Sequence, residues 1–191
     1  SAKLGVPQSV TCVDKSNVLR GCQFFRSIFR EIAESYPKIG AKEAYIDAFT
    51  MWLVRDPEDL DVVVLPNMFG DIATDLASVL QGGMGMAASA NLGDKHMMFE
   101  PVHGSSPKHA GKNRVNPIAM LSSLQLMLEN LSLRHDDPLL DKYGNILQQS
   151  ISQHLSSDGP KTYDIGGTGT TSEVGDAIAD RVRRLLRNDK A

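Results

Sequence analysis

The chain has 191 residues, of which 41% are hydrophobic and 23% are charged, a balance typical of globular proteins. Its formal net charge of −3 argues against a protein that binds nucleic acid through a basic surface. No apolar run approaches the roughly 20 residues of a membrane span, and the first residues lack the order of a signal peptide. Cys12 and Cys22 provide neither a disulfide framework nor a metal-ligand spacing. We therefore expect a soluble, cytoplasmic protein without nucleic-acid or membrane partners.

Strand-like and helix-like segments alternate along the chain. The patterns predict, in chain order, a strand over 9–13, a helix over 18–36, a strand over 41–47, a helix over 48–58, a strand over 60–66, a helix over 69–80, a strand over 97–102 and helices over 117–131, 137–156 and 172–187. Short connections between such elements favour an α/β fold. No G-x-G-x-x-G sequence follows the first strand, so the ordinary Rossmann fingerprint is absent. The glycine-rich stretch at 81–94 is the expected boundary between two structural parts.

Three local expectations concern how these elements are built. Ser16 or Asn17 is expected to cap the first helix. The β-branched run at 60–66 predicts a buried strand. The helix over 69–80 is expected to face the core with an apolar stripe, which consists of Ile72, Leu76, Val79 and Leu80.

An acidic pair lies on this last helix. Asp71 and Asp75 are four residues apart, so their side chains point the same way, and like charges at this spacing repel by about 0.2–0.5 kcal/mol on an exposed helix. A divalent cation between them would reverse the sign, and Mg²⁺ or Mn²⁺ prefers such oxygen ligands. Asp47, expected at the end of a strand, offers a third ligand. Two solvated acids near a helix N-terminus are the alternative, because negative charge is favourable there.

Two further places carry candidate chemistry. Lys15 directly follows the first strand, and a desolvated lysine can transfer protons; an ordinary surface lysine is the alternative. The segment 97–117, MMFEPVHGSSPKHAGKNRVNP, puts glycines, cations and two histidines between a strand and a helix. A loop of this kind is typical of a bound anion, often a phosphate, at a helix N-terminus, with a plain surface loop as the alternative. His103 and His109 have no metal-ligand spacing with either cysteine.

Five stretches of the sequence, in order, resemble one family: the metal-dependent β-decarboxylating dehydrogenases, which include isocitrate and 3-isopropylmalate dehydrogenases. The stretches are VDKSNVL (13–19), YIDAFTMWLVR (45–55), NMFGDIATDLASVL (67–80), SANLGDKHMMFEPVHGSSPKHAGKNRVNP (89–117) and KTYDIGG (161–167). Five ordered matches are more specific than any single motif. The resemblance implies a partial isopropylmalate dehydrogenase-like fold of the α/β class. It also implies an enzyme that oxidises and decarboxylates a (2R)-hydroxy-dicarboxylic acid.

The resemblance further implies roles for individual residues. Lys15 and Asp47 match catalytic positions, and Lys15 is the lysine of the acid–base step. The positions that match carboxylates holding Mg²⁺ or Mn²⁺ are Asp47, Asp71 and Asp75. The positions that match contacts to NAD(P) are His103, Gly104, Ser105, Lys108, His109, Asn116 and Tyr163. Family dimers share active sites, so a homodimer is implied in which Lys15 and Asp47 serve the partner's site.

The cofactor and the substrate are indicated by different parts of the loop. NAD-preferring relatives typically have an aspartate at the position of Lys108, whereas SPKHAG is similar to the PKYAG of NADP-using isocitrate dehydrogenases. Tyr163 matches a tyrosine near the 2′-phosphate in those enzymes. FEPVHGS, in contrast, is more similar to isopropylmalate dehydrogenases than to the FEATHGT of the isocitrate branch. NADP is therefore expected, with NAD as the alternative. The expected substrate is 3-isopropylmalate, with isocitrate, tartrate or malate as alternatives.

The resemblance covers only the second half of family members. Residues 1–82 match part of the small dimerisation and substrate domain, and residues 83–191 match the C-terminal part of the large cofactor domain. The substrate-binding arginines and the tyrosine that partners the lysine belong to the other half, so the chain alone is expected to be inactive. A non-catalytic regulatory subunit or dimerisation fragment is the alternative. Such subunits tend to lose the metal carboxylates or the lysine, which this chain keeps.

Overall fold

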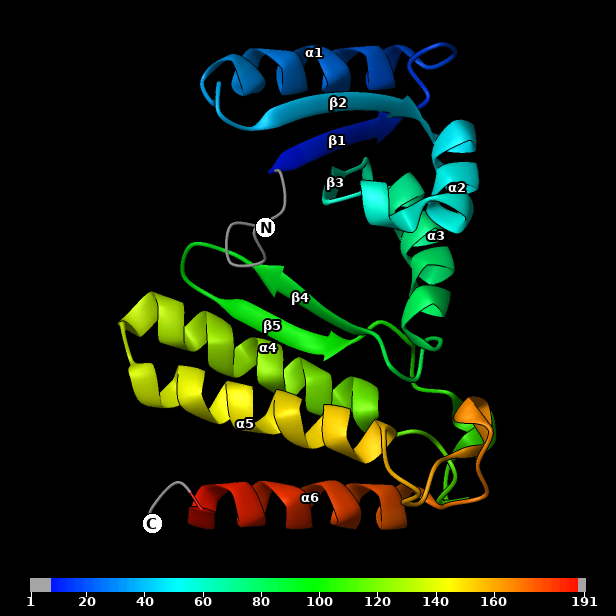
Figure 1. Ribbon diagram of the computed structural model, residues 1–191. Helices are drawn as coiled ribbons and strands as arrows, with labels where there is room; N and C mark the ends of the chain where they lie inside the picture. The colour runs from blue at the N-terminus through cyan, green and yellow to red at the C-terminus, as the bar shows by residue number, and fades with distance from the viewer. Residues whose placement is uncertain (1–7, 189–191) are drawn as a thin grey trace. The chain divides into compact units, whose positions relative to one another are not determined.

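The computed structural model describes residues 8–188 (Figure 1). The chain forms two compact units, Ser1–Ala77 and Ser78–Ala191, each with its own hydrophobic core. We call them the N-terminal unit and the C-terminal unit. The division lies just ahead of the glycine-rich stretch in which the sequence predicts a boundary.

A three-stranded parallel sheet forms the centre of the N-terminal unit. β1 (Ser9–Asp14) lies between β2 (Gly40–Tyr45) and β3 (Val62–Val64), and both neighbours run parallel to it (Figure 1). Parallel strands need crossover connections, which α1 (Arg20–Glu34) and α2 (Ile46–Arg55) supply, and α3 (Asn67–Ser78) follows β3. The register sets the last residue of β1 opposite the last residue of β2, so both strands end at the same edge.

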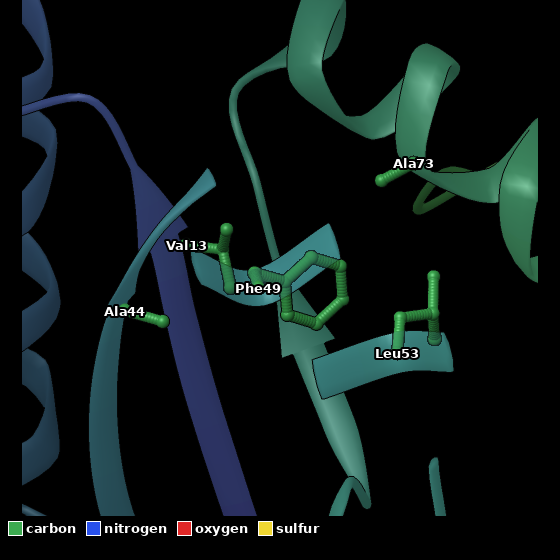
Figure 2. Close-up of a cluster of buried hydrophobic side chains, with 5 residues drawn as sticks. All are labelled: Val13, Ala44, Phe49, Leu53 and Ala73. Atoms are coloured by element: carbon green, nitrogen blue, oxygen red, sulfur yellow. The ribbon is translucent and has the colours of Figure 1, made fainter. Parts of the chain in front are cut away.

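Successive side chains of a strand point to opposite faces, and each face of this sheet has a different neighbour. The core on one face consists of Val13, Ala44, Phe49, Leu53 and Ala73, which come from the sheet, α2 and α3 (Figure 2). On the other face, Val10, Ala41 and Val64 line an apolar pocket of about 390 Å³ together with side chains of α1. The sheet is therefore apolar on both faces, as a parallel sheet between helices requires.

The first helix starts later than its expected capping residues. Ser16 and Asn17 do not cap α1, because Leu19 holds the N-cap position and makes no side-chain hydrogen bond. Two N–H groups of the preceding turn donate to the Lys15 carbonyl at 3.0 and 2.9 Å. The buried Asp14 carboxylate accepts from the Ser16 N–H. The turn is therefore fixed by the end of the strand rather than by a helix cap.

The burial of β3 and α3 also differs from the prediction. β3 is an edge strand, and Val62 is 51% exposed rather than buried. On α3 the buried residues are Ala73 and Ser78, with Leu76 packed beside the core. The expected core residues that are exposed instead are Ile72, Val79 and Leu80. The helix thus packs on its small side chains and leaves large apolar ones uncovered.

The C-terminal unit packs a hairpin against layered helices. β4 (Ala88–Leu92) pairs antiparallel with β5 (Met97–Pro101), and both strands contact α4 (Ile118–His135) (Figure 1). α5 (Pro138–Leu155) contacts both α4 and α6 (Thr171–Asn188). The core consists of Ile118, Leu147, Ile151, Val174 and Ile178. In the part of the chain that the structure describes, no helix is long and apolar enough to cross a membrane.

β4 is a strand that the sequence does not predict. Its residues, ASANL, have few side chains with high strand propensity and lie within the glycine-rich stretch. They form a strand because pairing with β5 satisfies their backbone hydrogen bonds. The other predicted elements of this unit, the strand over 97–102 and the helices over 117–131, 137–156 and 172–187, are confirmed with small shifts at their ends.

His154 on α5 is fully buried beside this core, which is an uncommon place for a titratable side chain. Within residues 8–188, neither ring nitrogen has a hydrogen-bond partner. Burial lowers the pKa of His154, the backbone of Pro160 offsets this in part, and the charges of Arg181 and Lys161 lower the pKa further. The imidazole is therefore neutral in the folded chain at neutral pH.

We expect acid to destabilise the C-terminal unit through His154. As pH falls below about 6.5, the unfolded chain takes up a proton that the folded chain resists, so stability present above this pH is lost below it. The loss approaches about 1.4 kcal/mol per pH unit while one extra proton binds the unfolded chain. His154→Phe should flatten the curve of unfolding free energy against pH between about pH 7 and 5.

Denaturant unfolding at several pH values measures this effect. The matched control is His96→Phe, because this substitution also removes an imidazole, but from an exposed position. Equal slopes for the wild type and His154→Phe would contradict the prediction.

Candidate active site

Lys15 and Asp47 meet at the edge of the sheet where β1 and β2 end. Lys15 is the first residue after β1, and Asp47 lies in the first turn of α2. Lys15 Nζ donates a hydrogen bond to Asp47 Oδ1 at 2.7 Å. The sequence predicted Asp47 as the last residue of a strand, which is wrong because α2 already begins at Ile46. The two residues that the sequence assigned to catalysis are nevertheless brought together.

The Lys15–Asp47 pair is ionised and partly exposed. The Lys15 side chain is 26% exposed and the Asp47 side chain 68%, so one side of the pair is open to solvent. The hydrogen bond from Lys15 holds the pKa of Asp47 below its usual value, and the carboxylate stays ionised at neutral pH. An exposed ion pair contributes little to stability, which leaves both side chains able to change partners when a ligand arrives.

Asp71 and Asp75 lie one turn apart on α3, and both are exposed. Their carboxylates project from the same side of the helix, as the spacing predicts. Among the described residues, no group of three or more histidine, cysteine or acidic side chains could hold a metal ion. The three expected ligands, all of them described, are therefore not gathered within one chain. The two carboxylates of α3 still fit two positions in the oxygen shell of Mg²⁺ or Mn²⁺.

A separate candidate site lies in the C-terminal unit. The loop after β5 and the loop before α6 line an open pocket of about 730 Å³, which we call the loop pocket. Six of the residues expected to contact a dinucleotide line this pocket: His103, Gly104, Ser105, His109, Asn116 and Tyr163. Lys108 belongs to the same loop but is exposed and lies outside the pocket lining. The structure thus gathers all but one of these residues around one opening.

His109 and Tyr163 on the wall of the loop pocket form an aromatic cluster, and Arg114, which lies outside the pocket lining, contacts it. The His109 ring stacks on the Tyr163 ring with centroids 6.1 Å apart. Ser106 Oγ lies 2.8 Å from His109 Nδ1 and fixes the ring. Arg114 Cζ lies over the Tyr163 ring, 4.2 Å from its centroid. Flat rings beside a guanidinium suit a ligand that is both planar and negatively charged.

Asn116 lies where three segments of the C-terminal unit meet. Its Nδ2 donates to Asp164 Oδ2 at 3.0 Å, and its Oδ1 accepts from the Ile118 N–H at the start of α4. Gly85 approaches the same point so closely that a Cβ there would lie 2.7 Å from Asp164 Oδ2. Asp164 and Gly85 are not among the site residues predicted from the sequence. For Asp164 a signal was available, since it follows Tyr163 in KTYDIGG.

Asn113 connects the loop to α6. Its backbone is left-handed, with φ 49°, a conformation that asparagine tolerates better than most residues. Its Oδ1 accepts from the Ser172 N–H at 3.1 Å and from the Ser172 hydroxyl at 3.0 Å. Its carbonyl accepts from the Thr171 N–H. The loop therefore caps a helix 59 residues further along the chain, a contact that no local sequence pattern reveals.

Comparison with known proteins identifies the family of the chain. The model of the isocitrate/isopropylmalate dehydrogenase family matches residues 1–178. The chain therefore belongs to the isocitrate/isopropylmalate dehydrogenase family. The partial isopropylmalate dehydrogenase-like fold predicted from the sequence is confirmed.

Two curated relatives define the level of similarity. The 3-isopropylmalate/3-methylmalate dehydrogenase of Methanocaldococcus jannaschii is 42% identical over 182 residues, which cover 95% of this chain and 52% of that protein. The 3-isopropylmalate dehydrogenase of Methanothermobacter thermautotrophicus is 41% identical over 173 residues, which cover 90% of this chain and 50% of that protein. The chain thus spans about half the length of the relatives it matches.

Solved structures are likewise matched over about half of their length. The isocitrate dehydrogenase from Methylococcus capsulatus superposes with a TM-score of 0.86 at 35% identity, covering 95% of this chain and 52% of that one. A β-decarboxylating dehydrogenase from Thermococcus kodakarensis superposes with a TM-score of 0.82 at 37% identity, covering 100% of this chain and 53% of that one.

Proposed function

We propose that this chain is the C-terminal half of an NAD(P)- and Mg²⁺- or Mn²⁺-dependent enzyme that oxidises and decarboxylates 3-isopropylmalate. The observation that carries the proposal is the 2.7 Å hydrogen bond between Lys15 and Asp47 at the ends of parallel strands. Relatives named 3-isopropylmalate dehydrogenase favour this substrate. The loop pocket supplies a place for the dinucleotide.

The residues of this chain would have separate roles in proton transfer and in metal binding. A bound divalent cation would stabilise negative charge on the substrate oxygens, and bound NAD(P)⁺ would accept the hydride. Lys15 would first release an ammonium proton to solvent and would then accept the proton of the substrate hydroxyl at its neutral Nζ, once a substrate oxygen replaces the Asp47 contact. Asp47 orients the ammonium until then. Asp71 and Asp75 would hold the cation from α3.

A homodimer with shared sites would supply the third carboxylate. Among the described residues one chain gathers no group of three such ligands, so the ligand that completes the α3 pair would come from Asp47 of a second copy. The large apolar side chains that α2 and α3 leave more than half exposed are Met51, Val54, Met68 and Ile72. Removing such surface from water is the main driving force of association. Each chain would then lend Lys15 and Asp47 to its partner's site.

Isocitrate is the alternative substrate. The Methylococcus capsulatus structure that superposes at a TM-score of 0.86 is named isocitrate dehydrogenase. Lys108, in a turn beside the aromatic cluster, also fits the NADP-using isocitrate branch. A complete enzyme that carries this chain distinguishes the two substrates by the ratio of their kcat/KM values.

NADP is the cofactor that the loop favours. A 2′-phosphate carries close to two negative charges, and Lys108 lies next to His109 in the turn Pro107–His109. A hydrogen bond between charged groups contributes roughly 1.5–3 kcal/mol, which corresponds to about 10- to 100-fold in affinity. Arg114 adds a second cation beside Tyr163.

The metal assignment predicts that Asp75→Asn weakens Mn²⁺ binding. The substitution keeps the shape of the side chain and removes the charged ligand, so affinity should fall by at least about tenfold, a scale seen even for residues that only support a ligand. Mn²⁺ titration of a complete enzyme that carries this chain measures it. Asp176→Asn, an exposed acid on α6, is the control for the lost charge. Equal affinity in the wild type and Asp75→Asn would exclude this ligand.

The dimer assignment predicts that Val54→Glu produces monomers. A charge on this exposed position of α2 would have to be buried without a partner if the surface is an interface. Sedimentation at micromolar concentration should show a dimer for the wild type and a monomer for Val54→Glu. Leu133→Glu, on an even more exposed leucine of α4, should stay dimeric. A monomeric wild type would overturn the assignment.

The cofactor assignment predicts that Lys108→Asp moves preference from NADP towards NAD. An aspartate would repel the 2′-phosphate and accept hydrogen bonds from the ribose hydroxyls, so the kcat/KM ratio should change by about 10- to 100-fold or more. Both cofactors are compared in the complete enzyme, with Lys95→Asp as the control, since Lys95 is exposed between β4 and β5 and lies outside this loop. A wild type that prefers NAD, with no change on substitution, would show that this interpretation of the loop is wrong.

A further inference from the structure

The residue before Lys15 is held by a buried ion pair that the proposed chemistry does not use. Asp14 is fully buried at the end of β1, and Arg26 of α1 is 9% exposed. Arg26 Nε donates to Asp14 Oδ2 at 2.9 Å, and Arg26 Nη2 donates to Asp14 Oδ1 at 2.8 Å. Such a two-point contact fixes both the distance and the orientation of the planar groups.

The same carboxylate fixes the backbone on the far side of Lys15. Asp14 Oδ1 also accepts from the Ser16 N–H at 2.7 Å, so the side chain of Asp14 reaches across Lys15. The Lys15 carbonyl in turn accepts two N–H groups of the next turn. Burial alone would raise the pKa of Asp14, but the hydrogen bonds from Arg26 and Ser16 outweigh it and lower this pKa, so the carboxylate is ionised.

Arg26 also contacts the strand that leads to Asp47. Arg26 Nη2 donates to the Ala44 carbonyl at 2.9 Å, and its guanidinium lies over the Tyr45 ring at 5.0 Å. Tyr45 is the N-cap residue of α2, whose first turn contains Asp47. One guanidinium thus connects the end of β1 with the end of β2. Lys15 follows the first of these ends, and Asp47 follows the second.

We propose that Arg26 is a positioning residue for the Lys15–Asp47 pair, acting through the Asp14 carboxylate and the Ala44 carbonyl. The expected effect on catalysis rests on the proposed function. The expected effect on the positions of Lys15 and Asp47 does not rest on it. A displacement of about 1 Å at a reacting group can cost about 100-fold in rate. Loss of the two-point contact should therefore lower kcat while the loop pocket, which contains none of these residues, keeps its affinity for the dinucleotide.

The chain offers a matched control on the same helix. Arg30 lies one turn after Arg26 and also donates to Glu43, at 2.6 and 2.7 Å, but its side chain is 63% exposed. Arg26→Lys and Arg30→Lys each replace a forked guanidinium with a single ammonium. In a complete enzyme that carries this chain, Arg26→Lys should lower kcat by about 100-fold with little change in the KM for NADP. Arg30→Lys should leave both close to the wild type.

A second readout uses the 191-residue chain and needs no activity. Nuclear magnetic resonance of ¹⁵N-labelled lysine side chains detects an ammonium held in a hydrogen bond, and Lys15→Arg assigns the signal. The hydrogen-bonded Lys15 signal should be lost in Arg26→Lys and kept in Arg30→Lys. If Arg26→Lys does not fold, the neutral double variant Asp14→Asn/Arg26→Gln removes both charges together, which buried pairs tolerate better than the loss of one partner.

The outcomes separate the two proposals. A wild-type kcat and an unchanged Lys15 signal in a folded Arg26 variant would overturn the positioning role. A parallel loss of activity and of cofactor affinity would also overturn it, because that pattern indicates general unfolding. Loss of the Lys15 signal in a chain whose complete wild-type enzyme oxidises no hydroxy-dicarboxylate would support the positioning role and reject the proposed function.

Discussion

The parallel pairing of β1 with β2 is the constraint on which the acid–base pair depends. The register places Asp14 opposite Tyr45, so the chain leaves both strands at one edge of the sheet. A slip of one residue would turn the side chains at this edge to opposite faces and separate Lys15 from Asp47. Carboxyl ends of parallel strands are the usual place for ligand sites in open α/β sheets. Here the register is reinforced by a buried guanidinium that bonds to both strand ends.

The C-terminal unit builds its site by other means. The loop pocket has no sheet to define its wall, because the hairpin ends before the loop begins. Its shape depends on amide side chains that bond to backbone groups at helix starts, Asn113 to the distant α6 and Asn116 to the adjacent α4. Each amide satisfies an N–H group at a helix start that would otherwise lack a partner. The same contacts therefore end the loop, begin the helices and shape the pocket.

The sequence was informative where the signal is local or where whole motifs match a family. The alternation of elements, the i, i+4 acidic pair and most of the pocket residues follow from such patterns. Burial was less predictable, because Ile72 belongs to an apolar stripe but α3 packs on Ala73 instead. Arg26 was missed because a buried arginine on a helix has the same sequence pattern as an exposed one. β4 was missed because its pairing with β5, rather than its composition, makes it a strand.

Gly85 has a consequence for the order in which the C-terminal unit folds. The place it occupies exists only once Asn116 and Asp164, 48 residues apart, have met. Contacts of such sequence separation carry a larger chain-closure entropy than contacts within helices and the hairpin, so we expect them to form later. We therefore expect the pocket to assemble late and to open early. A molecule that binds there would act on the whole unit, since binding only to the assembled form raises the free energy of unfolding by mass action.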